Sequence, residues 1–128
     1  MTANRPRLSE KEFDEAVQQA LARVPEEIRQ HMDNILITVQ RQPGPEMLEE
    51  AGVPPGASLF GLYLGVPLKD RSVFDLPLQP DTIFLFQDPL EEFCATREEL
   101  IEEIEITLVH EIAHLLGFTD AQLEDLGY

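Results

Sequence analysis

The sequence predicts an α+β fold, in which a small mixed sheet of three or four strands packs on an N-terminal helix and a central helix. An amphipathic helical pattern occupies residues 9–24, and a long apolar helical pattern follows residue 96. Three runs with strand character lie between them, at residues 34–40, 58–64 and 82–86. The length of 128 residues suits one domain with its own core, so we expect a single domain over residues 1–128.

The first helix is predicted by a start signal followed by a regular period. Ser9 and Glu12 have the spacing of a capping box, in which each side chain bonds the backbone near the other. Apolar residues then recur at helical spacing, at Phe13, Ala16, Val17, Ala20, Leu21 and Val24. Pro25 should end this helix and open a second short one over residues 25–32. His31, in that polar piece, is predicted to be an exposed surface residue.

The three strand-like runs differ in character. Residues 34–40 are rich in β-branched side chains and alternate, which predicts a strand. Residues 82–86 are apolar on both faces, which favours a central strand. Residues 58–64 contain Gly61, which indicates an edge position, a bulge or the close approach of another backbone.

The connections are rich in proline and glycine. Residues 42–57 predict a long connection with one helical turn at 46–51. Residues 65–81 form a second long connection, which is either a functional binding loop or a plain link between strands. Residues 87–95 should lead from the central strand into the last long helix.

The last long helix is predicted to be buried. Thr96 and Glu99 have the spacing of a second capping box at its start. Its first half is acidic, and the positive end of the helix dipole favours acidic side chains there. We expect these residues to form a solvated face: Glu98, Glu99, Glu102, Glu103 and Glu105. From Ile104 onward the pattern is apolar nearly all round, which is typical of a buried helix. Gly117 should end it in the left-handed conformation.

Residues 110–120 read H-E-x-x-H-x-x-G-x-x-D. His110 and His114 are four residues apart, so they lie on one helix face and can direct two imidazole nitrogens at one zinc ion. Glu111 lies about 100° round the helix, where it can reach a water molecule on the metal and act as general base. We expect the turn at Gly117 to return a carboxylate oxygen of Asp120 to the same metal. Asp120 should also start a short helix over residues 121–126.

Three protein ligands and a water molecule make the open arrangement of a catalytic zinc site. The competing interpretation is a coincidental pair of histidines on a core helix. The full motif arises by chance far more rarely than H-E-x-x-H alone, so we favour Zn²⁺ bound by His110, His114 and Asp120.

This motif resembles that of the metzincin branch of the zincin metallopeptidases, in which the third ligand is His or, less often, Asp. The short chain with the motif near its C-terminal end is similar to the small bacterial zincin-like metallopeptidases. The resemblance implies a minimal zincin-like fold whose central helix binds zinc, and a zinc-dependent peptidase with Glu111 as general base. It also implies that the strand at 58–64 is an antiparallel edge strand, beside which an extended peptide substrate adds as a further strand.

The sequence departs from the metzincin pattern after the third ligand. Metzincins carry a Met-turn there, whereas no methionine follows Asp120. We therefore expect weak cleavage of short or extended peptides, or cleavage that depends on a partner completing the cleft. The main alternative is a non-catalytic zinc-binding or peptide-binding module on the same scaffold, and a second alternative is metal-dependent hydrolysis of a substrate other than a peptide.

Charge and composition narrow the partners. The net charge is −16, from 25 acidic against 9 basic residues. Such a field argues against nucleic acid or an anionic membrane surface, and favours a cationic or neutral substrate unless the charge serves only solubility. Cys94 is the one cysteine, so no intrachain disulfide forms, and we expect it to be a small buried residue. No signal peptide or membrane-spanning run is apparent, which predicts a cytoplasmic location and leaves the oligomeric state open.

Overall fold

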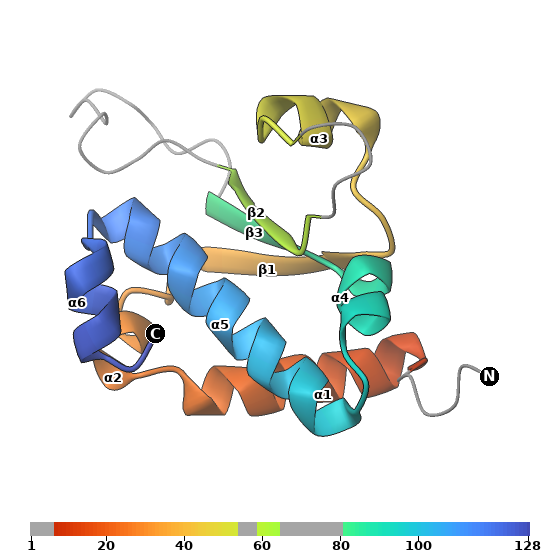
Figure 1. The fold of residues 1–128 in the computed structure, drawn as a ribbon, viewed down its shortest axis with the longest axis horizontal. Helices are drawn as coiled ribbons and strands as arrows, with labels where there is room; N and C mark the ends of the chain where they lie inside the picture. Colours follow the sequence, from red (N-terminus) through yellow and green to blue (C-terminus); the bar gives the residue numbers. More distant parts are fainter. Residues whose placement is uncertain (1–6, 54–58, 65–80) are drawn as a thin grey trace.

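The computed structural model describes residues 7–53, 59–64 and 81–128. Over these ranges it is an α+β fold, as predicted, with helices around a small mixed sheet (Figure 1). The elements in chain order are α1 (Glu10–Arg23), α2 (Glu26–Arg29), β1 (Ile35–Gln40), α3 (Pro45–Glu50), β2 (Gly61–Leu64), β3 (Asp81–Phe86), α4 (Gln87–Phe93), α5 (Arg97–Leu116) and α6 (Asp120–Asp125).

Within the described residues, the sheet has three strands in the order β1-β3-β2. β1 pairs with β3 in parallel, with Ile37 opposite Ile83, and β2 pairs with β3 antiparallel, with Tyr63 opposite Ile83. The central place of β3 and the edge place of β2 are as predicted. β2 begins at Gly61, later than the predicted start at residue 58, which lies outside the described residues together with most of the predicted 65–81 connection.

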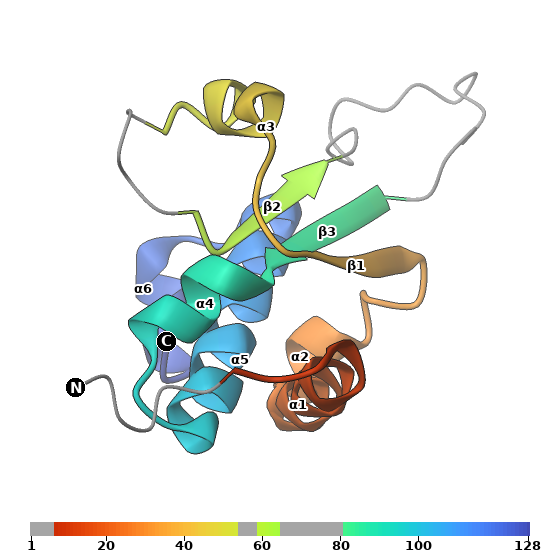
Figure 2. The same ribbon diagram turned by 90° about the vertical axis from the view of Figure 1, so that its right-hand side faces the viewer.

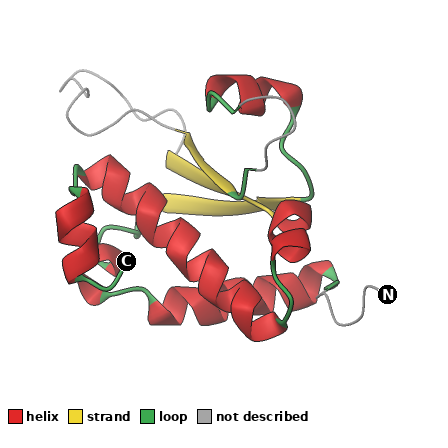
Figure 3. Ribbon diagram, viewed as in Figure 1, coloured by secondary structure: helices red, strands yellow, loops and turns green. Residues whose placement is uncertain are grey.

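The sheet and the helices form layers (Figures 1 and 2). α1 and α5 lie on one side of the sheet and α3 lies on the other. Figure 3, coloured by secondary structure, shows the three strands as one group above the long helices. The core fills the space between the sheet and α5, where Ile83 and Leu85 of β3 and Ile104, Leu108 and Ile112 of α5 are fully buried. This burial anchors α5 along its length.

The first helix forms as its sequence predicts. The Ser9 hydroxyl accepts a hydrogen bond from the Glu12 amide at 3.1 Å, and the Glu12 carboxylate accepts one from the Ser9 amide at 3.0 Å. These bonds to Ser9 lower the pKa of Glu12. The predicted apolar face is buried, at Phe13, Ala16, Val17 and Ala20. α1 ends at Arg23. Pro25 takes the N-cap position just before α2, whereas the sequence predicts it as the first residue of that helix.

The start of α5 differs in one detail from the predicted capping box. The Thr96 hydroxyl accepts a hydrogen bond from the Glu99 amide at 3.1 Å, as expected. The Glu99 carboxylate, however, accepts from the amide of Ala95 at 2.8 Å and not from that of Thr96. The Glu99 side chain therefore bonds the amide one residue before the N-cap, which lies outside the helix, and not the N-cap amide itself.

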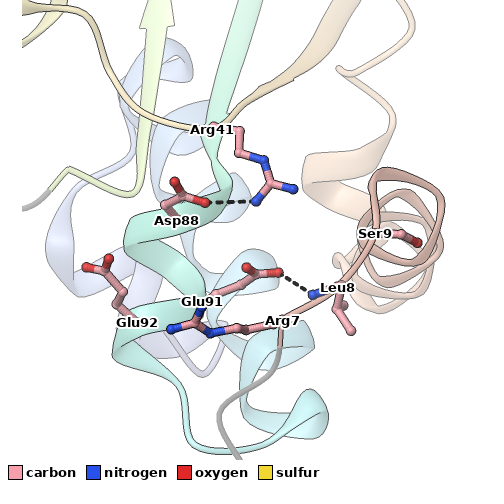
Figure 4. Close-up of a pocket in the computed structure, with 7 residues that line it drawn as sticks. All are labelled: Arg7, Leu8, Ser9, Arg41, Asp88, Glu91 and Glu92. Atoms are coloured by element: carbon pink, nitrogen blue, oxygen red, sulfur yellow. Dashed lines mark hydrogen bonds and ion pairs between the residues drawn. The ribbon is translucent and has the colours of Figure 1, made fainter.

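α4 is a helix that the sequence pattern does not predict, and it is bonded to distant parts of the chain (Figure 4). The Glu91 carboxylate accepts a hydrogen bond from the Leu8 amide at 2.9 Å. Within α4 it also accepts one from Gln87 Nε2 at 3.0 Å. Gln87 Nε2 also donates to the Leu8 carbonyl at 2.9 Å. Arg41 pairs with Asp88 at 3.0 Å. These bonds hold the segment before α1 and the end of β1 against α4.

Cys94, which follows α4, is buried as predicted, with 2 % of its surface exposed. Burial raises the pKa of its thiol to about 11, with further contributions from Glu103, Glu99 and Glu102. A thiol held in its neutral form in the core behaves as a small hydrophobic residue and not as a nucleophile. Within the described ranges no helix is both long enough and apolar enough to cross a membrane.

Candidate functional site

The second half of α5 carries His110, Glu111 and His114. Its apolar face holds Val109 and Ile112 in the core, so the helix turn that bears the two histidines is fixed by packing. His110 is half-buried and His114 is exposed. The centroids of their rings are 6.2 Å apart, with an angle of 74° between the ring planes. The structure therefore places the two imidazoles side by side on one face, as their spacing predicts.

The chain turns sharply after this face. Gly117 has φ of 80°, the left-handed conformation that ends α5. Its amide donates to the His114 carbonyl at 3.1 Å, and the Phe118 amide donates to the Ala113 carbonyl at 2.9 Å. The predicted role of Gly117 as the end of the helix is confirmed.

Asp120 lies just beyond this turn, but not as the cap that the sequence analysis expects. Thr119 caps α6: its hydroxyl accepts from the Gln122 amide at 3.1 Å, and its amide donates to Gln122 Oε1 at 2.7 Å. Asp120 is instead the first residue of α6 and is exposed. A Thr hydroxyl followed by Gln three residues later satisfies two amides at once, so Thr119 takes the capping position.

The metal site is only partly assembled by these elements. In the part of the chain that the structure describes, no three His, Cys, Asp or Glu side chains form a group that could hold a metal ion. The side chains of His110 and His114 lie side by side, whereas the Asp120 side chain does not form a three-ligand group with them. Two imidazoles and a carboxylate nonetheless form a donor set that suits zinc. Because Asp120 is exposed, its side chain can change rotamer without disturbing the core, and its role as third ligand stays a prediction.

Glu111 lies where α5 faces β2. The main-chain N–H of Tyr63, in the middle of β2, donates a hydrogen bond to the Glu111 carboxylate. Burial raises the pKa of Glu111, while the neighbouring charge of His114 and the bond from Tyr63 act in the opposite direction. A half-buried carboxylate of raised pKa is a stronger proton acceptor than a solvated one.

The contact between Glu111 and Tyr63 does not follow from the sequence pattern. The donor is a backbone amide, which every residue except proline carries, so no side-chain pattern marks it. The one signal was Gly61, for which the close approach of another backbone was one of three interpretations, beside an edge position and a bulge.

Other ionisable groups lie on α5 or contact it. Burial and the nearby Glu102 raise the pKa of Glu103, and His110 counteracts this shift. The Tyr128 hydroxyl donates a hydrogen bond to the Glu105 carboxylate, and burial and this bond raise the pKa of Tyr128. The pocket shown in Figure 4 lies between α4 and the segment before α1, and none of the motif residues lines it.

A search of curated proteins finds no match to this chain. A family model described as zincin-like metallopeptidase matches residues 32–128. The match extends from just before β1 to the end of the chain and includes the whole motif of residues 110–120. It covers most of the sequence, and the chain therefore belongs to the zincin-like metallopeptidase family.

Proposed function

We propose that this protein hydrolyses peptide bonds, with zinc held by His110, His114 and Asp120 and with Glu111 as general base. Membership of the family implies zinc-dependent peptide hydrolysis in general. The observation that carries the assignment is the arrangement on α5. Two imidazoles lie 6.2 Å apart on one face of a helix anchored in the core, and the carboxylate between them in sequence faces the edge strand.

The chemistry divides between the ion and the side chains. When bound, zinc polarises the scissile carbonyl and acidifies the attacking water. Glu111 takes a proton from that water and later passes it to the leaving amine. A carboxylate ligand in place of a neutral histidine lowers the net charge of the site by one, so Asp120 makes the water less acidic. More of the proton transfer then depends on Glu111.

The place of β2 at the edge of the sheet, among the strands that the structure describes, supports an extended peptide as the substrate. The Phe86 amide donates to the Phe60 carbonyl at 2.9 Å, so residues 60 and 86 form a hydrogen-bonded pair. Bonded and non-bonded pairs alternate along an antiparallel ladder. Gly61 therefore directs its backbone groups away from β3, toward the side where a peptide can add as a strand, whereas the Tyr63 amide on that side already bonds Glu111. The net charge of −16 favours a cationic or neutral peptide, and we propose no nucleic-acid or membrane partner.

Cleavage of a degenerate peptide library tests this function. We expect the purified protein to cleave extended peptides slowly, to lose this activity on treatment with a chelator and to regain it when zinc is added. The measurement is product release followed by mass spectrometry in the three states. Cleavage that is insensitive to the chelator, or no cleavage in any state, would refute the proposal.

A second experiment separates a catalytic zinc ion from one that only holds the fold together. The core is built from apolar side chains of α1, β3 and α5, so we expect the metal-free protein to unfold cooperatively at a modestly lower melting temperature. Thermal unfolding followed by circular dichroism, with and without chelator, measures this difference. Loss of the cooperative transition on chelation would indicate a structural zinc site, as in zinc fingers.

A further inference from the structure

β2 and α5 approach each other closely at Gly61. A Cβ atom at this position would lie 2.6 Å from Thr107 Cγ2 and 3.2 Å from the Phe84 carbonyl oxygen. Gly61 is not among the glycines with positive φ, so it is the space and not the backbone conformation that requires glycine. Any side chain at this position must push β2 away from α5 or displace Thr107.

Thr107 is poorly able to move. Its side chain is β-branched, and such side chains have few allowed rotamers in a helix. Its hydroxyl also donates to the Glu103 carbonyl at 2.8 Å, which fixes the direction of the methyl group. The contact between Gly61 and Thr107 therefore sets how near the edge strand lies to the helix.

β2 and α5 also contact each other further along both elements, at Tyr63 and Glu111. Tyr63 is two residues beyond Gly61, a rise of about 6.5–7 Å in a strand. Glu111 is four residues beyond Thr107, a rise of about 6 Å in a helix. The two steps are nearly equal, so the close approach at Gly61 continues to Tyr63, whose N–H points off the sheet edge and bonds Glu111.

We propose that Gly61 is a positioning residue for Glu111. Its lack of a side chain lets β2 lie near enough to α5 for the Tyr63 amide to hold the Glu111 carboxylate in one orientation. The catalytic consequence rests on the proposed function, whereas the structural link between Gly61, Tyr63 and Glu111 does not. A general base must lie within hydrogen-bonding reach of the proton it accepts, so a small displacement of β2 lowers the rate at unchanged metal content.

Gly61→Ala tests the proposal with two measurements. We expect kcat to fall about 10- to 100-fold at unchanged zinc content, as for a misplacement of about 1 Å. We also expect the Tyr63 amide to exchange its hydrogen about tenfold faster, as measured by NMR, because its bond to Glu111 is weakened. Gly44→Ala is the matched control, because no atom of the described residues lies within 4 Å of a Cβ there, and both values should stay at the wild-type level.

A compensating substitution separates positioning from general damage to the fold. Thr107→Ser removes the Cγ2 methyl group that a Cβ atom added at Gly61 would meet, but it keeps the hydroxyl that bonds Glu103. The double variant Gly61→Ala/Thr107→Ser, compared with Thr107→Ser alone, should recover most of kcat and of the Tyr63 protection. A folded double variant that recovers neither would overturn the proposal.

Hydrogen exchange at the Tyr63 amide also tests the link between Gly61 and Glu111 without any measurement of activity. Glu111→Ala should also speed exchange at the Tyr63 amide, and this arm applies even if Gly61→Ala does not fold. Unchanged protection of Tyr63 in Glu111→Ala, or in folded Gly61→Ala, would overturn the proposed link. If the wild-type protein cleaves no peptide, the proposed function fails, while the exchange measurements still decide whether Gly61 positions Glu111.

Discussion

Replacing Glu111 by glutamine should cut peptide turnover by about 10²–10⁴-fold, the usual effect of losing a general base. Glutamine keeps the size of the side chain, and its amide oxygen can still accept the hydrogen bond from the Tyr63 amide. It cannot take a proton from water. Zinc content should stay at the wild-type level, because Glu111 is not a ligand in this account.

The stability of Glu111→Gln follows from the raised pKa of Glu111. In the metal-free protein, burial raises this pKa above its value in the unfolded chain. The stabilising contribution of the neutral acid is then complete below the unfolded pKa and is lost as the pH rises through the folded pKa. Above the folded pKa the ionised carboxylate opposes folding, so in that pH range the glutamine variant should unfold at the same temperature as wild type or slightly above it.

The measurement compares wild type and Glu111→Gln on the same peptide library at equal zinc occupancy. Glu103→Gln is a matched control, because Glu103 is also a partly buried carboxylate of raised pKa on α5 and has no part in the proposed proton transfer. Its turnover should equal that of wild type. Equal rates for wild type and Glu111→Gln would assign the cleavage to another site or protein. Binding of extended peptides by both, with cleavage by neither, would favour a peptide-binding module.

Asp120→Ala should weaken zinc binding far more than Glu124→Ala does. Both acids lie on the exposed side of α6, but only Asp120 follows the turn at Gly117 closely enough to match the motif. Removing a group that only orients a ligand typically lowers metal affinity by roughly 10- to 100-fold. Removing a direct ligand should lower the zinc affinity by more than this. Glu124→Ala should leave the affinity within about twofold of wild type on the same scale.

Competition with a chromogenic chelator measures both affinities. Asp120 lies in the first turn of α6, where an acidic side chain adds only about 0.3–1 kcal/mol through the helix dipole. The melting temperatures of the metal-free variants should therefore stay close together, so a difference in zinc affinity reports on ligation. A larger loss for Glu124→Ala would make Glu124 the third ligand.

The long elements could be predicted from sequence because their signals are local. α1 begins at the Ser9 capping box and buries the apolar face that its period predicts. β3 is apolar on both faces and lies at the centre of the sheet. α4 was missed because Pro89 lies in its first turn and its start lacks a side-chain cap. Its stabilising bonds come from Leu8 and Arg41, far away in the chain, which no local pattern reveals.

Some features of the candidate site also follow from local sequence signals, whereas others depend on tertiary packing. The side-by-side placement of His110 and His114 follows from helix geometry alone, so the sequence sufficed. The position of Asp120 depends on which residue caps α6, and Thr119 competes for that role with a better-placed hydroxyl. The bond from Tyr63 to Glu111 depends on how the edge strand packs on α5, which is a tertiary property.

The most direct test of zinc at this site is elemental analysis of protein purified without chelators, for wild type and for the double variant His110→Ala/His114→Ala. We predict about one zinc ion per chain in the wild-type protein, and none in the variant, since each structural or catalytic zinc needs at least three protein ligands. Wild-type protein that contains no divalent metal, and that takes up none when zinc is added, would contradict the account.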